Sequence, residues 1–272
     1  MRIKSRILFD MERMQADELL QPIKKSADKN DTLQVVELFN DTREYDYLMN
    51  ELNKLGIEIT EQKENVYSQS EMNAALLLQI VPNSYCGYPQ PEDGYFEASF
   101  DSNTGCKECS YGRIQDRPLR LHKPKIGKND ILGVWWLTVL VMTTKLKNII
   151  EQEKLTGCEV WSIIDHKKKT EFEDLHQLYI PSELPAMSSK TNIIMNYDFK
   201  CSLCGRGECF MKGDKIYERS SLEAIKDFNL SKEWFGSCLG IWRVPFASQR
   251  VYRLFQEHNI KGVRFVPATV VE

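Results

Sequence analysis

Two pairs of cysteines are the residues of this sequence with the clearest chemistry. Cys106 and Cys109 enclose Lys-Glu, and Cys201 and Cys204 enclose Ser-Leu. Two residues between paired cysteines is the spacing of metal-binding turns, and four thiolates in a tetrahedron suit zinc. A site with four protein sulfurs leaves no open position for a substrate water. We therefore predict one structural zinc ion, bound by two thiolates from each pair.

Other uses of these cysteines stay open at the level of the sequence. The thiols could be unliganded, or they could form a redox pair or disulfides, although a reducing compartment disfavours disulfides. Cys209 or His122 could also replace one of the four ligands, because each follows a pair in the sequence. Cys86 has no partner at this spacing and is expected to be an ordinary thiol.

The motifs of common catalytic and nucleotide-binding sites are missing from the sequence. No Gly-x-x-x-x-Gly-Lys-Ser/Thr, Gly-x-Gly-x-x-Gly, His-Glu-x-x-His or Gly-x-Ser-x-Gly occurs. The four histidines are scattered, and Cys158 and Cys238 have no neighbour in the sequence that would activate a thiol. We therefore expect a protein that is not an enzyme.

Length and composition exclude several classes of protein. The chain has 272 residues, of which 42% are hydrophobic and 28% charged, as in an ordinary globular protein. The net charge of −3 does not favour nucleic acid or an anionic membrane as a partner. The N-terminus lacks a secretory signal, and the longest apolar run, Ile131 to Met142, is too short for a bilayer and predicts a buried strand or strand pair. We expect a cytoplasmic protein.

A segment that occurs twice in the sequence provides the elements around the cysteine pairs. Residues 141–157 align without a gap with residues 246–262, at an offset of 105 (262 − 157). Thr143 and Ser248 match as candidate N-caps of a helix, and Gly157 and Gly262 match as the residues that end it. Between them, both copies have an apolar face at i, i+3 and i+4 spacing. These faces are Leu146, Ile149 and Ile150 in the first copy and Val251, Leu254 and Phe255 in the second.

The order of the elements predicts the fold class and its divisions. The cysteine pairs are offset by 95 residues (201 − 106), close to the offset of the two helices. We infer a duplicated unit, cysteine pair plus strand-helix-strand, with one zinc ion joining the copies in an α+β fold. The expected divisions are an N-terminal α/β segment (1–84), a first repeat unit (85–180) and a second (181–272). Residues 167–190 are the expected linker between the copies.

The N-terminal segment carries a surplus of acidic residues. Between Asp31 and Glu64 nine acids stand against three bases. Such a segment either keeps a helix face in solvent or forms a docking surface for a basic partner. On the second interpretation, the candidate partner-binding residues are Glu44, Asp46 and Glu51.

Shorter patterns predict further elements. Strands are expected at 33–39, 57–60 and 76–81, and a helix between residues 41 and 55. Ser220 and Glu223 form a capping box for a short helix that would continue to Phe228. Five aromatic residues are expected to lie in the core rather than to form a ligand platform: Trp135, Trp136, Trp234, Phe235 and Trp242.

The stretch from Arg113 to Lys128 is the most basic part of the sequence. Pro118, Pro124 and Gly127 predict an extended or looped chain here. Its cations could simply be solvated, or they could bind phosphates, which makes a zinc-ribbon protein that binds nucleic acid or regulates a partner the alternative function. The candidate cations are Arg113, Arg117, Arg120, Lys123 and Lys125.

These features together resemble the double-CXXCG motif family. The resemblance rests on Tyr111 to Leu121 after the first cysteine pair, on Leu155-Thr156-Gly157, and on Ser248 to Phe265, and it covers residues 70–272. That family is bacterial, and its members are similar to immunity proteins of polymorphic or contact-delivered toxin systems, with a repeated immunity domain. The resemblance implies an antitoxin that binds and neutralises a cognate toxin protein in the cytoplasm.

The sequence departs from the family pattern beside the first cysteine pair. Ser110 stands where the family often has glycine, and only Cys204 is followed directly by a glycine. We expect Gly112 to compensate for this difference, which removes no metal ligand.

Overall fold

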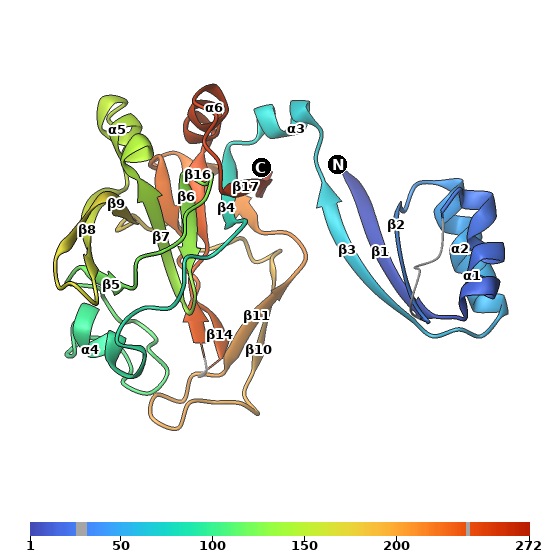
Figure 1. Ribbon diagram of the computed structural model, residues 1–272, viewed down its shortest axis with the longest axis horizontal. Coiled ribbons are helices and arrows are strands. Elements are labelled where there is room, and N and C mark those ends of the chain that lie inside the picture. The colour runs from blue at the N-terminus through green and yellow to red at the C-terminus, as the bar shows by residue number, and fades with distance from the viewer. Residues whose placement is uncertain (26–31, 238–239) are drawn as a thin grey trace. The chain divides into compact units, whose positions relative to one another are not determined.

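The computed structural model describes residues 1–25, 32–237 and 240–272. The chain divides into two compact units, Met1–Met72 and Asn73–Glu272; the first is a mixture of helices and strands, and in the second strands prevail (Figure 1). The boundaries expected after residues 84 and 180 differ from this division, because both positions lie inside the second unit. None of the helices in the described ranges is long and apolar enough to cross a membrane.

The first unit is a three-stranded antiparallel sheet with two helices packed against it. The strand order is β2-β1-β3, so the first strand of the chain is central. Ile7 and Phe9 of this strand are buried in one cluster with Leu20 and Leu48 of the two helices. The elements are β1 (Arg2–Asp10), α1 (Arg13–Leu20), the 3-10 helix η1 (Gln21–Ile23), β2 (Leu33–Phe39), α2 (Arg43–Lys54), β3 (Ile59–Val66) and α3 (Gln69–Ala74), within which the division falls.

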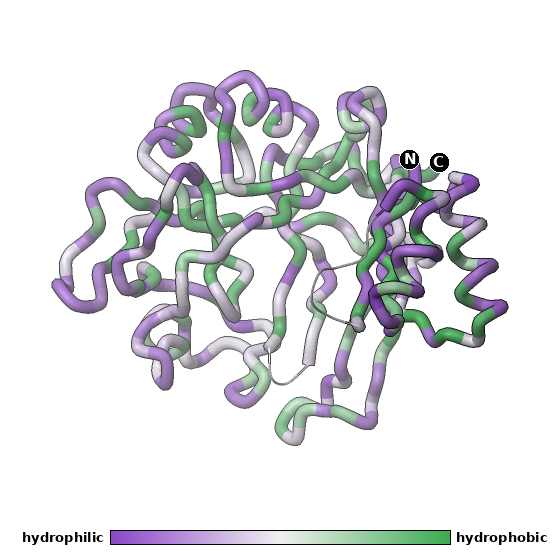
Figure 2. Tube along the Cα trace, turned by 45° about the vertical axis from the view of Figure 1, so that its right-hand side comes forward, coloured by the Kyte–Doolittle hydropathy of each residue, from purple (hydrophilic) through white to green (hydrophobic). Residues whose placement is uncertain are grey.

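The sequence patterns of this unit predicted its elements well. The strand expected at 33–39 is β2, and the expected helix is α2, whose N-cap Thr42 accepts a hydrogen bond from the Tyr45 N–H at 3.3 Å. The strand expected at 57–60 begins two residues later, as β3. The side chains of Leu48 and Leu52 make the buried face of α2, and hydrophilic and hydrophobic residues alternate along the helices of the chain (Figure 2).

Two sheets form the centre of the second unit. The first has the order β5-β8-β9-β7-β6, and the second has the order β13-β16-β4-β17. The helix α5 (Thr144–Gln152) connects β7 to β8, and α6 (Gln249–Glu257) connects β16 to β17; both lie at the same end of the unit (Figure 1). The strands are β4 (Leu77–Pro82), β5 (Leu119–Leu121), β6 (Ile131–Val134), β7 (Leu137–Thr143), β8 (Glu159–Asp165), β9 (Glu171–Tyr179), β13 (Phe228–Leu230), β16 (Pro245–Ser248) and β17 (Val263–Pro267).

Four strands of each sheet correspond in order, direction and register. The order β6-β7-β9-β8 matches β13-β16-β4-β17, and all neighbours are antiparallel. Thr143 pairs with Leu175 of β9, and Ser248 pairs with Leu77 of β4. The inner strands β9 and β4 nevertheless come from different places in the chain order. The strand β9 follows the helix α5, whereas β4 precedes all the other strands of its sheet. Residues 171–179, which we expected to be part of a linker, are this central strand β9.

The two helices and both sheets share one hydrophobic core. Leu146 and Ile150 of α5 lie in the same buried cluster as Val251, Leu254 and Phe255 of α6. The strand residues of this cluster occupy corresponding positions in the two sheets: Ile131 and Phe228, Met142 and Ala247, and Leu178 and Ile80. The predicted apolar faces are therefore confirmed, and they pack against each other's sheets rather than in two separate cores.

The helices end before the predicted glycines: α5 ends at Gln152 and α6 at Glu257, and the left-handed residues that follow are Lys154 (φ +51°) and Asn259 (φ +49°). The expectation that Gly157 and Gly262 end the helices is therefore wrong, and these glycines instead touch the other half's sheet.

Gly157 has φ +80°, and a Cβ there would lie 2.1 Å from the carbonyl oxygen of Phe228 in β13. Gly262 has φ +113°, and its Cβ would lie 1.9 Å from the carbonyl oxygen of Ile131 in β6. Both the left-handed conformation and the close approach exclude a side chain, so both glycines are required.

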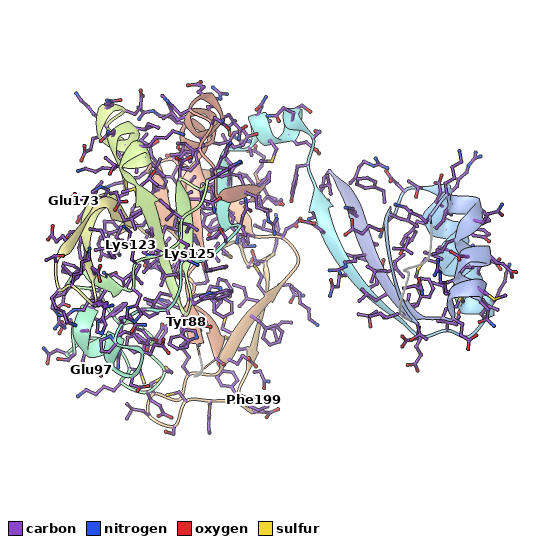
Figure 3. All side chains as sticks on the ribbon, in the orientation of Figure 1. Tyr88, Glu97, Lys123, Lys125, Glu173 and Phe199 are labelled. Carbon is purple, nitrogen blue, oxygen red and sulfur yellow. The ribbon has the colours of Figure 1, made fainter. Side chains whose placement is uncertain are left out.

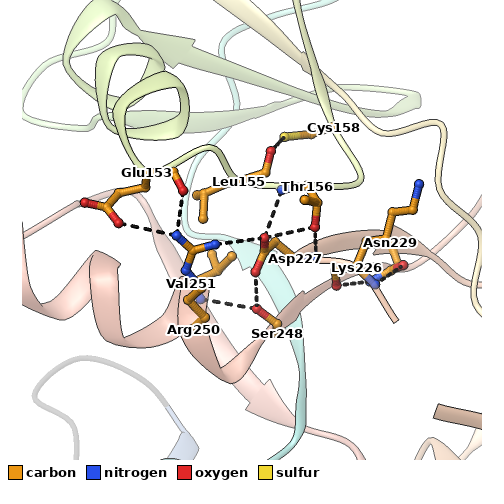
Figure 4. A network of polar contacts seen from close by, with 10 residues as sticks. All are labelled: Glu153, Leu155, Thr156, Cys158, Lys226, Asp227, Asn229, Ser248, Arg250 and Val251. Atoms are coloured by element: carbon orange, nitrogen blue, oxygen red, sulfur yellow. Dashed lines mark hydrogen bonds and ion pairs between the residues drawn. The ribbon is translucent and has the colours of Figure 1, made fainter. Parts of the chain in front are cut away.

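Two aspartates join the sheets at corresponding positions. Asp227 accepts hydrogen bonds from the Thr156 N–H (2.9 Å) and hydroxyl (3.0 Å) and from the Ser248 hydroxyl (2.9 Å), and Arg250 lies 3.4 Å away (Figure 4). Asp130 accepts from the Lys261 N–H at 3.0 Å and pairs with Lys145 at 3.3 Å. Asp227 directly precedes β13 and Asp130 directly precedes β6, and each carboxylate accepts a hydrogen bond from the connection that follows the other half's helix.

The expected helix caps differ in outcome. Ser248 caps α6 by accepting from the Val251 N–H, as predicted. Thr143 makes no such bond, and its buried hydroxyl has no partner among the described residues. The helix expected to continue from Ser220 to Phe228 is wrong: a 3-10 helix η3 covers Arg219–Leu222, and Phe228 begins β13.

Smaller elements complete the second unit. A four-stranded sheet has the order β10-β11-β14-β15, and β12 pairs in parallel with β18. The remaining elements are the 3-10 helix η2 (Glu92–Gly94), α4 (Tyr95–Ser99), β10 (Asn192–Asn196), β11 (Glu208–Lys212), β12 (Ile216–Glu218), β14 (Phe235–Ser237), β15 (Gly240–Trp242) and β18 (Thr269–Val271). The first cysteine pair lies in the connection from α4 to β5, and the second lies between β10 and β11.

Candidate metal centre and its surroundings

The two cysteine pairs meet. The sulfur of Cys106 lies 3.7 Å from that of Cys201, and the sulfur of Cys109 lies 3.6 Å from that of Cys204. All four sulfurs lie within 4.8 Å of one another, and only Cys204 is exposed to solvent. This group of thiols could hold a metal ion, and it contains the four residues that the spacing predicted.

The two cysteine turns have the same backbone. The Ser110 N–H donates to the Cys106 carbonyl and the Gly205 N–H donates to the Cys201 carbonyl, both at 2.9 Å. Four residues after the first cysteine, the chain is left-handed in both turns, with φ +66° at Ser110 and +70° at Gly205. Ser110 itself therefore adopts the conformation that glycine favours, so our expectation that Gly112 compensates for it is wrong.

The backbone of the first turn activates its thiol. The N–H of Cys109, followed by that of Glu108, lowers the pKa of the Cys106 thiol to about 7, which outweighs the effect of burial. A thiolate is the form that binds a metal ion. Gly105 closes this turn, because a Cβ there would lie 2.4 Å from the Arg113 nitrogen.

Glu108 links the two turns, which the sequence did not indicate. Its carboxylate accepts from the Ser202 hydroxyl at 2.5 Å and from the Leu203 N–H at 3.1 Å, and the Cys201 sulfur lies 3.6 Å away. The hydrogen bond from Ser202 holds the pKa of Glu108 below its usual value. Glu108 thus fixes the second turn against the first without being a member of the sulfur group.

The two candidate replacement ligands lie elsewhere. Cys209 is buried on β11 in a cluster with Leu184 and Phe235, and burial raises the pKa of its thiol. His122 follows β5, and its ring lies 5.4 Å from that of His166.

Two further thiols are kept protonated. Burial raises the pKa of Cys86 to about 11 and that of Cys158 to about 12. Both thiols are therefore protonated at neutral pH. Cys238 lies outside the described residues.

The acidic candidates lie on α2 in the first unit. Glu44 and Asp46 are in the first turn of this helix, where negative charge also stabilises the helix dipole. Glu51 pairs with Lys54 at 2.6 Å. These contacts give the three acids a local structural role beside any role in docking.

Two of the basic candidates are occupied by the chain itself. Arg113 lies over the ring of Phe96 at 4.1 Å and donates to the Cys106 carbonyl. Arg117 pairs with Asp116 at 3.0 Å and donates to the Phe100 carbonyl. The remaining candidates, Arg120, Lys123 and Lys125, lie on β5 and the connection that follows it (Figure 3).

Four exposed aromatic side chains form what we call the aromatic ridge: Tyr85, Tyr88, Trp135 and Trp136, with exposed fractions of 41%, 41%, 44% and 50%. Tyr85 stacks on Trp135 with ring centres 4.1 Å apart, and Tyr88 contacts Trp136 at 4.4 Å. The expectation that Trp135 and Trp136 lie in the core is therefore wrong. It is also wrong for the exposed Trp242 and correct for the buried Phe235; Trp234 is half-buried.

The backbone holds the aromatic ridge rigidly. Trp135 and Trp136 form the turn between β6 and β7, and the N–H of Trp135 donates to the Gly87 carbonyl at 3.0 Å. The Cys86 N–H donates to the Gly133 carbonyl, and Gly133 lies under the ring of Tyr85, where a Cβ would approach to 2.7 Å. Trp136 has φ +66°, which is an outlier for such a bulky residue and costs on the order of 1 kcal/mol or more.

A cavity of about 710 Å³ opens beside the aromatic ridge within the second unit. Trp136 and Phe96 line one part of it, and Trp234 and Arg243 line another. Its polar walls are satisfied internally: Gln115 and Gln177 exchange hydrogen bonds at 2.8 and 2.7 Å, and Arg243 pairs with Glu183 at 2.7 Å. The cavity extends the aromatic surface inward.

Comparison with known proteins adds no further assignment: neither a family model nor a curated protein matches this chain.

Proposed function

We propose that this chain is a binding protein, an immunity protein that attaches to a cognate bacterial toxin domain and neutralises it. The observation that carries this proposal is the aromatic ridge. Contiguous exposed apolar surface marks sites of protein association, and Trp and Tyr supply most of the binding energy at such sites. The resemblance of the cysteine turns and repeats to the double-CXXCG family supports the same class of protein.

The strain at Trp136 supports a binding role. Trp136 occupies a turn position that favours Gly or Asn, and half of its side chain is exposed. Strained backbone that presents an exposed side chain is typical of binding sites. The hydrogen bonds from the Cys86 and Trp135 N–H groups also pre-organise the ridge, which lowers the entropic cost of association.

The charges near the aromatic ridge favour a basic partner. Glu92, Asp93 and Glu97 are exposed on η2 and α4, in the segment that follows Tyr88 (Figure 3). Acidic residues beside an aromatic surface attract a basic protein surface and speed the encounter. We therefore expect the toxin to present a basic surface to this side of the second unit.

The metal ion that fits the sulfur group is zinc, which we assign as structural. With a Zn–S distance of about 2.3 Å, neighbouring sulfurs of a tetrahedral site lie about 3.8 Å apart. The distances between the cysteine pairs are 3.7 and 3.6 Å, which agrees with such a tetrahedron. The thiolates of Cys106, Cys109, Cys201 and Cys204 would hold the ion, whose chemical role is to cross-link two distant turns.

We further propose that the second unit arose by duplication. The support is the common register of the two four-stranded sheets, the matched core positions and the matched aspartates Asp130 and Asp227. The repeated element runs from β6 to β8 in the first copy and from β13 to β17 in the second. The central strand is supplied by β9 in one copy and by β4 in the other.

The experiment is co-expression with the product of the reading frame next to this gene, tested first for toxicity, followed by a titration of the two purified proteins. The wild-type chain is expected to restore growth and to bind, and Trp135→Ala/Trp136→Ala is expected to weaken binding by roughly 30-fold or more. The control is Tyr197→Ala/Phe199→Ala, which removes two exposed aromatic side chains outside the ridge (Figure 3). A wild-type chain that neither binds nor protects would reject the function.

A charge-reversal variant tests the other candidate surface. Glu44→Lys/Asp46→Lys/Glu51→Lys changes the acidic face of α2 in the first unit. If that face docks the toxin, this variant loses more affinity than the double tryptophan variant. Unchanged binding would remove these three residues from the interface and leave the aromatic ridge as the docking surface.

A further inference from the structure

Two basic segments that are far apart in the sequence meet at one corner of the second unit. Parallel pairing of β5 with β8 places Leu121 beside Asp165, and the His166 N–H donates to the Leu121 carbonyl at 2.8 Å. The residues that flank these positions are almost all basic. We call this group the basic corner: Arg120, His122, Lys123, Lys167, Lys168 and Lys169.

Residues 119–125 and 163–170 contain one acidic residue, Asp165, and its side chain is turned inward. Asp165 is buried, and its Oδ1 accepts from the N–H groups of Lys167 and Lys168 at 2.9 and 3.1 Å. These backbone donors, that of Lys168 first, lower the pKa of Asp165. Its charge therefore shapes the turn between β8 and β9 and leaves the three lysine side chains exposed.

The basic residues of the two segments lie close enough to affect the ionisation of His166. The rings of His122 and His166 meet edge to face, 5.4 Å apart. Burial lowers the pKa of His166, and the positive charges of Lys169, His122 and Arg120 lower it further. Five full cations gather at this corner of a chain with a net charge of −3, and the exposed acids that follow them in the sequence, Glu171, Glu173 and Asp174, lie on the neighbouring strand β9. Glu171, opposite Ile164 on β9, marks the end of this corner.

We propose that the basic corner binds the phosphate backbone of a nucleic acid. Several cations on neighbouring segments suit a chain of regularly spaced phosphates, each of which one Lys or Arg can neutralise. An anionic membrane is disfavoured, since none of the exposed large apolar side chains in the described part of the chain lies at this corner to insert between lipids. This activity is separate from toxin binding at the aromatic ridge.

The proposal differs from the nucleic-acid interface that the sequence indicated. Arg113 and Arg117 leave the set because they are engaged with Phe96 and Asp116. Lys167, Lys168 and Lys169 enter it because of strand pairing, although they lie more than forty residues from Lys123.

The experiment measures binding of the full chain to a fluorescent 20-base-pair DNA and a 20-nucleotide RNA over a salt series. With five phosphate contacts, the slope of log K against log salt on duplex DNA is expected to be about −4.5. Lys167→Gln/Lys168→Gln/Lys169→Gln should reduce that slope by about 3, since three contacts are lost. The turn of this variant is retained, because its hydrogen bonds use backbone groups.

The matched control is Lys200→Gln/Lys212→Gln/Lys232→Gln, which removes the same charge from three exposed lysines elsewhere in the second unit. A control slope close to the wild-type slope supports the basic corner. Equal losses in both triple variants would overturn it, because net charge would then explain the binding. Absence of binding at low salt, or binding only to vesicles with anionic lipid, would also overturn it, whatever the outcome of the toxin experiment.

Discussion

The two halves of the second unit build the same four-stranded arrangement by different routes. In the first half, the central strand β9 follows α5 and β8; in the second half, the central strand β4 precedes the whole segment from β13 to β17. The register is nevertheless the same, with Leu178 opposite Val160 and Ile80 opposite Phe265. The place in the sheet that β9 or β4 occupies therefore requires a strand with alternating apolar residues. Chain connectivity does not decide which segment fills that place.

The two halves differ most in the connections that follow α5 and α6, where each connection contacts the other half's sheet. Asp227 has hydrogen-bonding groups of Thr156 and Ser248 as well as Arg250 around it, whereas Asp130 has only the Lys261 N–H and Lys145. The two junctions thus have the same backbone geometry, but Asp227 accepts more hydrogen bonds than Asp130. We expect the two junctions to differ in stability accordingly.

The largest loss of stability is expected from substitutions in the sulfur group, where the two cysteine pairs should contribute equally. Cys106→Ser and Cys201→Ser should each release the metal ion and lower the Tm by roughly 10 °C or more, because the cross-link between distant turns is lost. Bound zinc and the thermal transition measure this, with Cys86→Ser as the control that keeps the metal. If Cys201→Ser retains a full equivalent of zinc and the wild-type Tm, the four-sulfur site is wrong and the equivalence of the pairs fails.

The second effect is a difference between the two aspartates. Asp227→Ala should lower the free energy of unfolding by about 3 kcal/mol, since three donors, the Thr156 N–H and hydroxyl and the Ser248 hydroxyl, lose their charged acceptor and Arg250 loses its partner. Asp130→Ala should cost about 1 kcal/mol, because only one backbone donor is lost and Lys145 can be solvated. Denaturant unfolding measures both values. Equal losses would show that the density of the network does not determine the strength of the junction.

The smallest effect is expected at the left-handed residue of each cysteine turn. Ser110→Gly should raise stability and Gly205→Ser should lower it, each by about 1 kcal/mol, because a side chain is disfavoured at positive φ. Zinc content should stay the same in both variants. A loss of stability in Ser110→Gly would mean that the serine side chain makes a contribution larger than its conformational cost.

Local patterns in the sequence predicted the parts that depend on near neighbours. The spacing within Cys106–Cys109 and Cys201–Cys204 indicated the four sulfurs that meet and could hold a metal ion, and the apolar spacing indicated α5 and α6. The Ser220–Glu223 box failed, since the strand β13 begins at Phe228, six residues beyond Leu222, and its pairing with β16 outweighs local helix propensity.

What the sequence by itself determined about this protein is the chemistry of the cysteine pairs and the two helices, because both follow from contacts within a few residues. Only the tertiary structure decided which segments supply the central strands β9 and β4, that Trp135 and Trp136 are exposed, and that Lys167 lies near Lys123. These outcomes depend on pairing between residues far apart in the chain, whose free energy comes from the shared core. The pattern at 76–81 predicted the strand β4 but not its partners, and β9 was expected to be part of a linker.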